Sequence, residues 1–172
     1  RERVAYAAWS PRTSRLAAAK LAGMIGFELC GFDTAGPAGR PVYHANVMLS
    51  IGERFALLCS ASILSSGRDE VRARLVASGR EIIEITPTQM ACFAGNLLQL
   101  DGRYGPVIAL STSALDALDA DQRERLAGHG RLVAADIPTI ERGGGSLRCM
   151  LGEIFLPRSR PAGHPTADRI SP

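Results

Sequence analysis

The feature that most constrains the fold of this chain is an order of strand-like and helical segments that recurs three times before Pro157. The first repeat contains a predicted helix that ends at Gly26. One face of this helix carries Ala17, Leu21, Met24 and Ile25. The last helix opens with the capping pattern Asp119-x-x-Gln122. The predicted strands are residues 4–9, 27–32, 47–51, 55–59, 81–85, 93–100, 107–110, 132–135 and 147–155, and two further predicted helices lie around 68–77 and 121–127.

Single helices separated by several short strands favour an α+β class over a doubly wound parallel sheet, in which one strand alternates with one helix. Recurrence of one element order indicates repeated units, here of the ββαβ kind. We therefore predict about three such units in a radial arrangement. A chain of 172 residues is long enough to form one ordinary domain.

Composition excludes several classes of protein. With 46% hydrophobic and 22% charged residues, the chain is typical of a globular protein. Its net charge of +3 is spread without a run of five basic residues, which argues against nucleic-acid binding, and no apolar stretch reaches the length of a membrane span. The chain opens at Arg1 rather than Met, which suggests an internal start within a longer product. Residues 158–172 carry three prolines and one large aliphatic residue, so we predict a disordered tail.

Four cysteines lie 29, 33 and 57 residues apart, without a CxxC pair or a cluster of histidines. This spacing argues against a metal site and favours reduced thiols in the cytoplasm. Cys30 and Cys59 fall inside apolar strand patterns and are interpreted as core residues. Cys92 receives no role.

The fourth cysteine, Cys149, follows the glycine run Gly143–Gly145. Consecutive glycines allow a ligand to approach the backbone closely, and Gly145 is the glycine nearest to the thiol. A nucleophilic thiol must ionise near neutral pH, and a neighbouring cation such as Arg148 or oriented backbone N–H groups promote ionisation. The alternative is that Cys149 is a small buried apolar residue beside a surface hairpin, and the spacing alone does not separate the two readings.

Of three histidines, only His44 lies between a Gly/Pro-rich loop and an apolar strand, where a catalytic group would be expected. Imidazole is suited to proton transfer near neutral pH. The alternative is a structural histidine at a strand edge. Asn46 and Asn96 also lie beside apolar strand residues, where they either hydrogen-bond a planar polar ligand or form turns.

Three segments together resemble a known family. They are PVYHANVMLSIG (residues 41–52), FAGN (93–96) and DIPTIERGGGSLRCMLGEIFLP (136–157). In this combination they are similar to the citrulline-utilisation hydrolases, also described as arginine deiminase-related or amidinotransferase-family proteins. The resemblance extends in consistent order over residues 4–157.

The resemblance implies the pentein α/β propeller, in which five ββαβ units surround a central active site. Residues 1–157 would then form a partial catalytic domain of about three units. The family also places an acidic substrate-gripping residue and a Glu-Gly-Thr-Gly-type segment ahead of the region where this chain begins. We therefore expect the sequence to be a fragment.

The resemblance further implies that Cys149 attacks a ureido or guanidino carbon while His44 serves as acid and base, with no cofactor and a small amino-acid substrate. Asn46, Asn96 and Gly145 would contact that substrate. Arginine deiminases carry His-x-Asp where this chain has His44-x-Asn46, and a neutral amide suits the ureido group of citrulline better than a guanidinium. The alternatives are arginine deimination, amidino transfer, or an inactive binding-only remnant. The oligomeric state stays open.

Overall fold

The first sheet of the molecule is a parallel pair of strands joined by a helix. The computed structural model describes residues 3–36 and 39–153. Strand β1 (Val4–Ala8) pairs in parallel with β2 (Glu28–Phe32), and helix α1 (Arg15–Ile25) connects them. Gly26 ends α1 in the left-handed conformation, at φ 68°, as predicted.

The second and third sheets each contain three strands in the same arrangement: an antiparallel pair, then a strand that runs parallel to its neighbour after a helical crossover. The second sheet consists of β3 (Leu49–Ile51), β4 (Phe55–Leu58) and β5 (Glu81–Glu84), with α2 (Ser65–Ala77) as crossover. The third consists of β6 (Leu98–Gly102), β7 (Gly105–Ser111) and β8 (Arg131–Ala135), with α4 (Thr112–Ala117) and α5 (Ala120–Ala127).

This repetition confirms the predicted α+β class and its ββαβ units. Among the described residues, the first sheet contributes the βαβ part alone. The shorter elements are α3 (Pro87–Ala91), α6 (Pro138–Glu141) and the 3-10 turns η2 (Ala45–Val47), η3 (Ser60–Ser62) and η4 (Leu147–Met150). The tail predicted at 158–172 lies outside the described residues.

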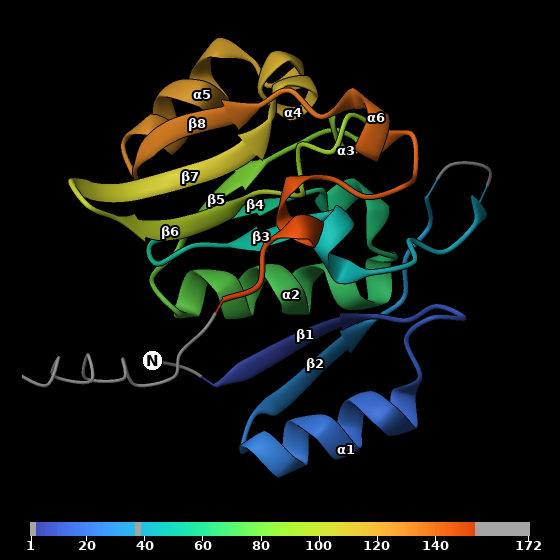
Figure 1. Ribbon diagram of the computed structural model, residues 1–172. Coiled ribbons are helices and arrows are strands. Elements are labelled where there is room, and N and C mark those ends of the chain that lie inside the picture. The colour runs from blue at the N-terminus through green and yellow to red at the C-terminus, as the bar shows by residue number, and fades with distance from the viewer. Residues whose placement is uncertain (1–2, 37–38, 154–172) are drawn as a thin grey trace, which may run out of the picture.

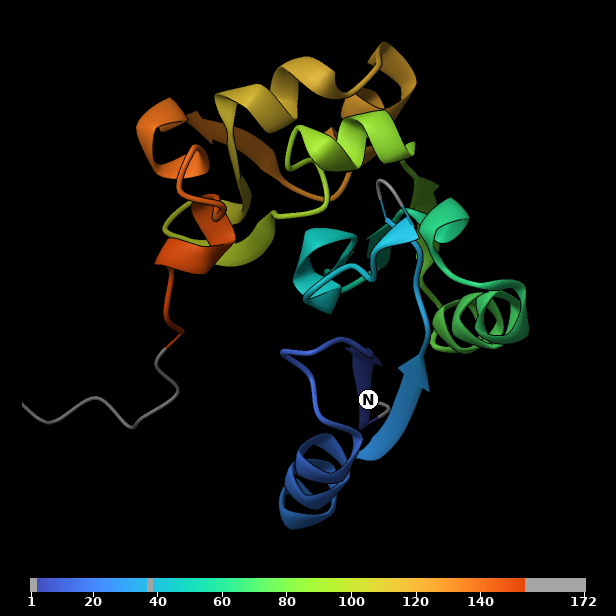
Figure 2. The same cartoon turned by 90° about the vertical axis from the view of Figure 1, so that its right-hand side faces the viewer.

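Helices fill the space between successive sheets. Helix α2 lies between the first and second sheets, and α5 contacts both β5 and β8 (Figure 1). In the side view, η2 and η4 lie on the same side of the three sheets (Figure 2). The largest fully buried side chains belong mainly to the second and third units: Met48, Phe55, Leu57, Leu58, Ile63, Leu75, Ile83, Leu97, Ile108, Leu110, Leu118 and Leu126.

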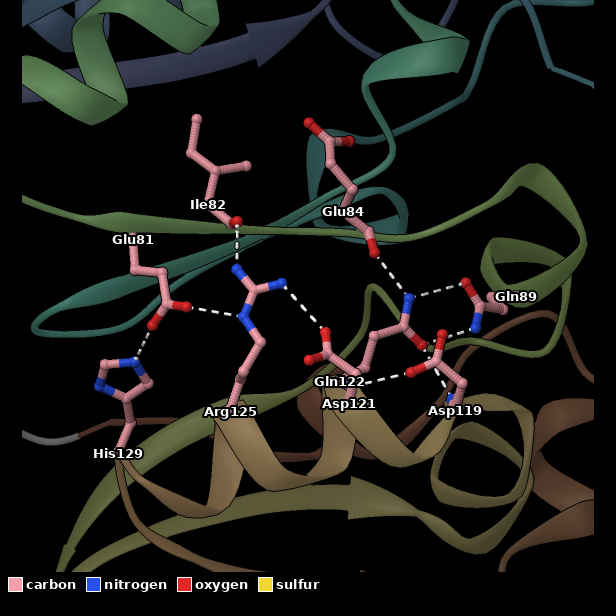
Figure 3. Close-up of polar contacts among 9 residues, drawn as sticks. All are labelled: Glu81, Ile82, Glu84, Gln89, Asp119, Asp121, Gln122, Arg125 and His129. Carbon is pink, nitrogen blue, oxygen red and sulfur yellow. Dashed lines mark hydrogen bonds and ion pairs between the residues drawn. The ribbon is translucent and has the colours of Figure 1, made fainter.

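Helices α2 and α5 are also each attached to the preceding sheet by an ion pair at the first residue of a strand. Arg125 of α5 donates from Nε to Glu81 of β5 at 2.7 Å and from Nη2 to the Ile82 carbonyl at 2.8 Å, and His129 Nε2 lies 2.8 Å from Glu81 (Figure 3). Glu28, at the start of β2, likewise pairs with Arg74 of α2 at 2.6 Å. The units are therefore joined by one repeated contact.

Two predictions of local structure are wrong. Residues 147–150 form η4 rather than the start of a strand, because Cys149 N and Leu151 N donate to the nearby carbonyls of Ser146 and Arg148 instead of to a neighbouring strand. Residues 154–155 of that predicted strand lie outside the described part of the chain. The strand predicted at 93–100 begins only at Leu98, since residues 92–95 form a turn.

The predicted apolar face of α1 exists, but it is exposed. Leu21, Met24 and Ile25 are 58%, 76% and 47% exposed, and Ala22 is the one buried residue of the helix. Helix α1 thus packs on its own sheet through small residues and directs its large apolar side chains outward.

Candidate active site

Three loops that are distant in sequence meet at the Cys149 thiol. One contains η2 and Asn46, the second is the turn that precedes β6 and contains Asn96, and the third is the glycine-rich loop that ends in η4. Asn96 Nδ2 lies 3.4 Å from the Cys149 sulfur, and Asn46 Nδ2 lies 3.9 Å from it. Cys149 itself is exposed. The fold therefore presents one accessible thiol between two side-chain amides.

The glycine-rich loop is anchored on both sides. Gly144 adopts φ 90°, and its carbonyl accepts a 2.8 Å hydrogen bond from Tyr43 Oη. A Cβ on Gly145 would lie 3.5 Å from Cys149 Cβ, so Gly145 is in ordinary van der Waals distance of the nucleophile candidate. Ser146 is fully buried and donates to Glu141 at 2.7 Å. These contacts hold the backbone around Cys149 in place.

Glu141 is the charged group that anchors this loop. Burial favours a higher pKa for its carboxyl group, but hydrogen bonds from Ser111, Ser113 and Ser146 outweigh burial and leave the pKa below its usual value. The carboxylate thus ties the end of β7 and the start of α4 to the glycine-rich loop.

Tyr43 lies beside the candidate nucleophile. Its pKa is raised, first by burial and then by the neighbouring Cys149, with Arg12 acting in the opposite direction. The guanidinium of Arg12 lies over the Tyr43 ring at 5.4 Å from the centroid. Tyr43 therefore stays protonated and continues to donate to the Gly144 carbonyl.

His44 occupies the same loop as Asn46, and its described side-chain contact is with Tyr43. Its side chain is exposed and packs edge to face with Tyr43, with 5.1 Å between ring centroids. Within residues 3–36 and 39–153, no hydrogen bond joins His44 to Cys149. The structure thus brings together Cys149, Asn46, Asn96 and Gly145, and leaves His44 adjacent to them.

A pocket of about 230 Å³ opens next to Asn46. Arg148 also lines it, and its Nη1 lies 3.4 Å from both Ser50 Oγ and the Leu97 carbonyl. The Arg148 guanidinium is therefore directed at this pocket rather than at the sulfur. The other lining residues are Val4, Tyr6, Ala45, Leu49 and Ile51.

Sequence reasoning missed several residues that support the site. Tyr43 and Ser146 stand inside the motifs that drew attention to Cys149 and His44, so their positions were a usable signal. The sequence carried no signal for Ser50, because a serine in a short apolar strand does not indicate which groups it will hydrogen-bond. Its Oγ donates to the carbonyls of Gly95 and Leu97 at 2.7 and 2.8 Å.

In the described part of the chain, no three His, Cys, Asp or Glu side chains are grouped so as to hold a metal ion. None of the described helices is both long and apolar enough to cross a membrane.

The repeated ββαβ units, with an exposed thiol in a glycine-rich loop, have a pentein-type fold, which the solved structures of ArgZ and AgrE share. Residues 1–156 match the family described as N,N dimethylarginine dimethylhydrolase, eukaryotic, and the chain belongs to that family. No curated protein matches it.

Solved structures share the fold at low sequence identity. The AgrE ternary complex with ornithine and NAD⁺ is 14% identical, with a TM-score of 0.72 over 92% of this chain and 22% of that one. The product-bound N-terminal domain of ArgZ, an arginine dihydrolase of the ornithine-ammonia cycle in cyanobacteria, is 15% identical, with a TM-score of 0.68 over 86% of this chain and 50% of that one. Agmatine deiminase of C. jejuni is 12% identical, with a TM-score of 0.50 over 86% and 51%. The chain thus spans about half of the ArgZ domain.

Proposed function

We propose that this chain carries the nucleophile of a hydrolase that cleaves a C–N bond in the ureido or guanidino group of an arginine-like amino acid. The observation that carries the proposal is the exposed Cys149 thiol, held between two amides beside a pocket that Asn46 and Arg148 line. The family description and the names of the structural neighbours support it, since dimethylarginine, arginine and agmatine share a guanidino group.

The chemistry follows from the thiol. The Cys149 thiolate adds to the planar carbon of the substrate and forms a C–S bond. The C–N bond to the leaving amine then breaks, and the amine departs with a proton. Water adds to the resulting thioester-like carbon and releases the thiolate. One hard cleavage is thereby divided into two easier steps.

His44 is the residue we assign to both proton transfers. Only one residue separates it from Asn46, and its side chain is exposed. Acid–base help of this kind is worth about a hundred- to ten-thousandfold in rate once hydrogen-bond contact with substrate is made. We therefore assign the His44 contact to the substrate-bound state.

Asn46 bears on substrate choice. Its Oδ1 is buried and has no hydrogen-bond partner among the described residues, so it is an acceptor available to a substrate N–H. A neutral amide accepts from a ureido group without the charge that would favour a guanidinium. Citrulline is accordingly the substrate we place first. The alternatives are deimination of arginine, hydrolysis of dimethylarginine to citrulline and dimethylamine, and amidino transfer. The four free cysteines fit a cytoplasmic protein.

The test is incubation of the purified protein with citrulline, arginine and N,N-dimethylarginine, with products measured by mass spectrometry. Ornithine from citrulline supports the ureidohydrolase, citrulline with ammonia from arginine indicates a deiminase, and citrulline with dimethylamine from N,N-dimethylarginine indicates a dimethylarginine hydrolase. Cys149→Ala should lower turnover by about a thousandfold or more at unchanged melting temperature, and Cys92→Ala is the matched exposed control. Full activity of Cys149→Ala would exclude the covalent route, and no product from any substrate would favour the binding-only reading.

A further inference from the structure

The Asn96 side chain is buried at the centre of the site, and each of its polar atoms has a partner. It is 1% exposed. Its Nδ2 donates to the Asn46 carbonyl at 2.9 Å, and its Oδ1 accepts from the Arg148 backbone N–H at 3.1 Å. A buried amide with these partners is closed to bulk solvent and joins all three loops of the site.

These two backbone partners determine which way the amide faces. A carbonyl oxygen requires the nitrogen opposite it, and a backbone N–H requires the oxygen. Rotating the amide by 180° would place oxygen against the Asn46 carbonyl and N–H against the Arg148 N–H, so the opposite orientation is excluded. One N–H of Nδ2 therefore remains, and the Cys149 sulfur lies 3.4 Å from that nitrogen.

The turn that carries Asn96 is built for close approach. Asn96 N donates to the Phe93 carbonyl at 2.8 Å, and Phe93 is the one non-glycine residue in the described part of the chain with a positive φ, at 61°. A Cβ at Gly95 would overlap the Val47 carbonyl. A left-handed non-glycine residue costs free energy and persists only where the surroundings impose it. The left-handed backbone at Phe93 is part of the turn that brings the Asn96 amide to the Cys149 sulfur.

We propose that Asn96 is a positioning residue for the nucleophile: it donates a hydrogen bond to the Cys149 thiolate and orients it for attack, and it does not contact the substrate. This inference rests on the proposed role of Cys149 but not on any particular substrate. A donor aimed at sulfur stabilises the charged form over the neutral one. Removing it should make the thiol less reactive near neutral pH.

The test is the pH profile of Cys149 alkylation by iodoacetamide in the intact chain. Trypsin cleaves after Arg80, Arg103 and Arg148, so Cys92 and Cys149 fall on different peptides and are quantified separately by mass spectrometry. In the protein without substitutions, alkylation of Cys149 should reach half its maximal rate at a lower pH than alkylation of the exposed Cys92. Equal midpoints would count against the proposal before any variant is made.

Two variants and one control complete the experiment. Asn96→Ala should slow Cys149 alkylation at pH 7 about tenfold, and Asn96→Asp should slow it further, because a carboxylate replaces the donor with a negative charge. Ser62→Ala is the control, since it removes a buried hydroxyl whose contacts are the sulfur atoms of Cys59 and Met90 rather than that of Cys149. It should lower the melting temperature and leave the alkylation midpoint unchanged.

Overlapping profiles for the folded Asn96 variants and the unsubstituted protein would overturn the proposal, as would an equal shift from Ser62→Ala. Alkylation requires no substrate, so this result is independent of the activity assay. A shifted profile without turnover of any substrate would retain the positioning role and reject the proposed function.

Discussion

At the scale of single residues, the cysteines of this chain occupy contrasting environments. Cys30 is buried in β2, where burial raises its pKa to about 11. Cys59 is also fully buried, and its sulfur lies 3.3 Å from Ser62 Oγ. Cys92 and Cys149 are exposed, and Cys149 alone is described in contact with amide nitrogens. The fold thus separates structural thiols from an accessible one.

We expect Cys30→Ser to destabilise the protein by about 1–3 kcal/mol, because a hydroxyl would replace a weakly polar thiol in an apolar site. Urea denaturation measures the free energy of unfolding, and Cys92→Ser at the surface should change it by less than about 0.5 kcal/mol. Equal stability of the two variants would contradict the core assignment of Cys30.

Burial of Cys30 and Cys59 was predictable, because each stands in a short apolar run. The contact of Asn96 with Cys149 was not, since 53 residues separate them and no local pattern records that they meet. The same limit applies to Tyr43 and Gly144, which are 101 residues apart.

At the scale of elements, capping signals and apolar runs located most helices and strands. The Asp119 capping box is present as predicted, and an equivalent box at Thr86 opens the short helix α3, where the signal was available but not used. Residues 147–150 show where this approach fails. Their apolar side chains suggest a strand, whereas the Arg148 N–H is held by the Asn96 side chain, which prevents pairing with a strand.

The repeated ion pair between units predicts a pH dependence. Hydrogen bonds from His129 and then Arg125 lower the pKa of Glu81 below its ordinary value of 4.5. A carboxyl group with a lowered folded-state pKa stabilises the fold above its unfolded value, and this contribution is lost as the pH falls through the folded value.

Glu81→Gln should therefore reduce stability at pH 7 by about 0.5–1 kcal/mol, the range for a partly exposed pair, and the difference should vanish once the pH falls well below 4.5. Thermal melts between pH 3 and pH 8 provide the measurement. Glu124→Gln, at an exposed position of helix α5, should show no such dependence. A constant difference across the range would show that the contact is not electrostatic.

At the scale of the whole molecule, helix α1 differs from α2 and α5, each of which packs between two sheets. The main strand contacts of helix α2 are with two sheets, whereas those of α1 are with β2 of its own sheet, and Leu16 and Met24 of α1 are 80% and 76% exposed. Large exposed apolar patches are uncommon on the surface of a monomeric protein, so several such side chains on one helix call for a test.

The double variant Leu21→Gln with Met24→Gln should reduce the binding of an apolar fluorescent dye without lowering the melting temperature, since both side chains are mainly solvent-exposed. Tyr104→Gln, which removes a 90% exposed ring in the turn after β6, is the control and should leave dye binding unchanged. A large loss of stability in the double variant would show that the α1 face is packed.

The sulfur and its two amides lie 103 and 53 residues apart, and both amides precede the cysteine. During synthesis on the ribosome, Asn46 and Asn96 therefore emerge first, and Cys149 reaches them only after the third unit has been made. On the proposed roles of Asn96 and Cys149, the thiol therefore gains its hydrogen-bond donor only after the segments that carry both amides have been synthesised.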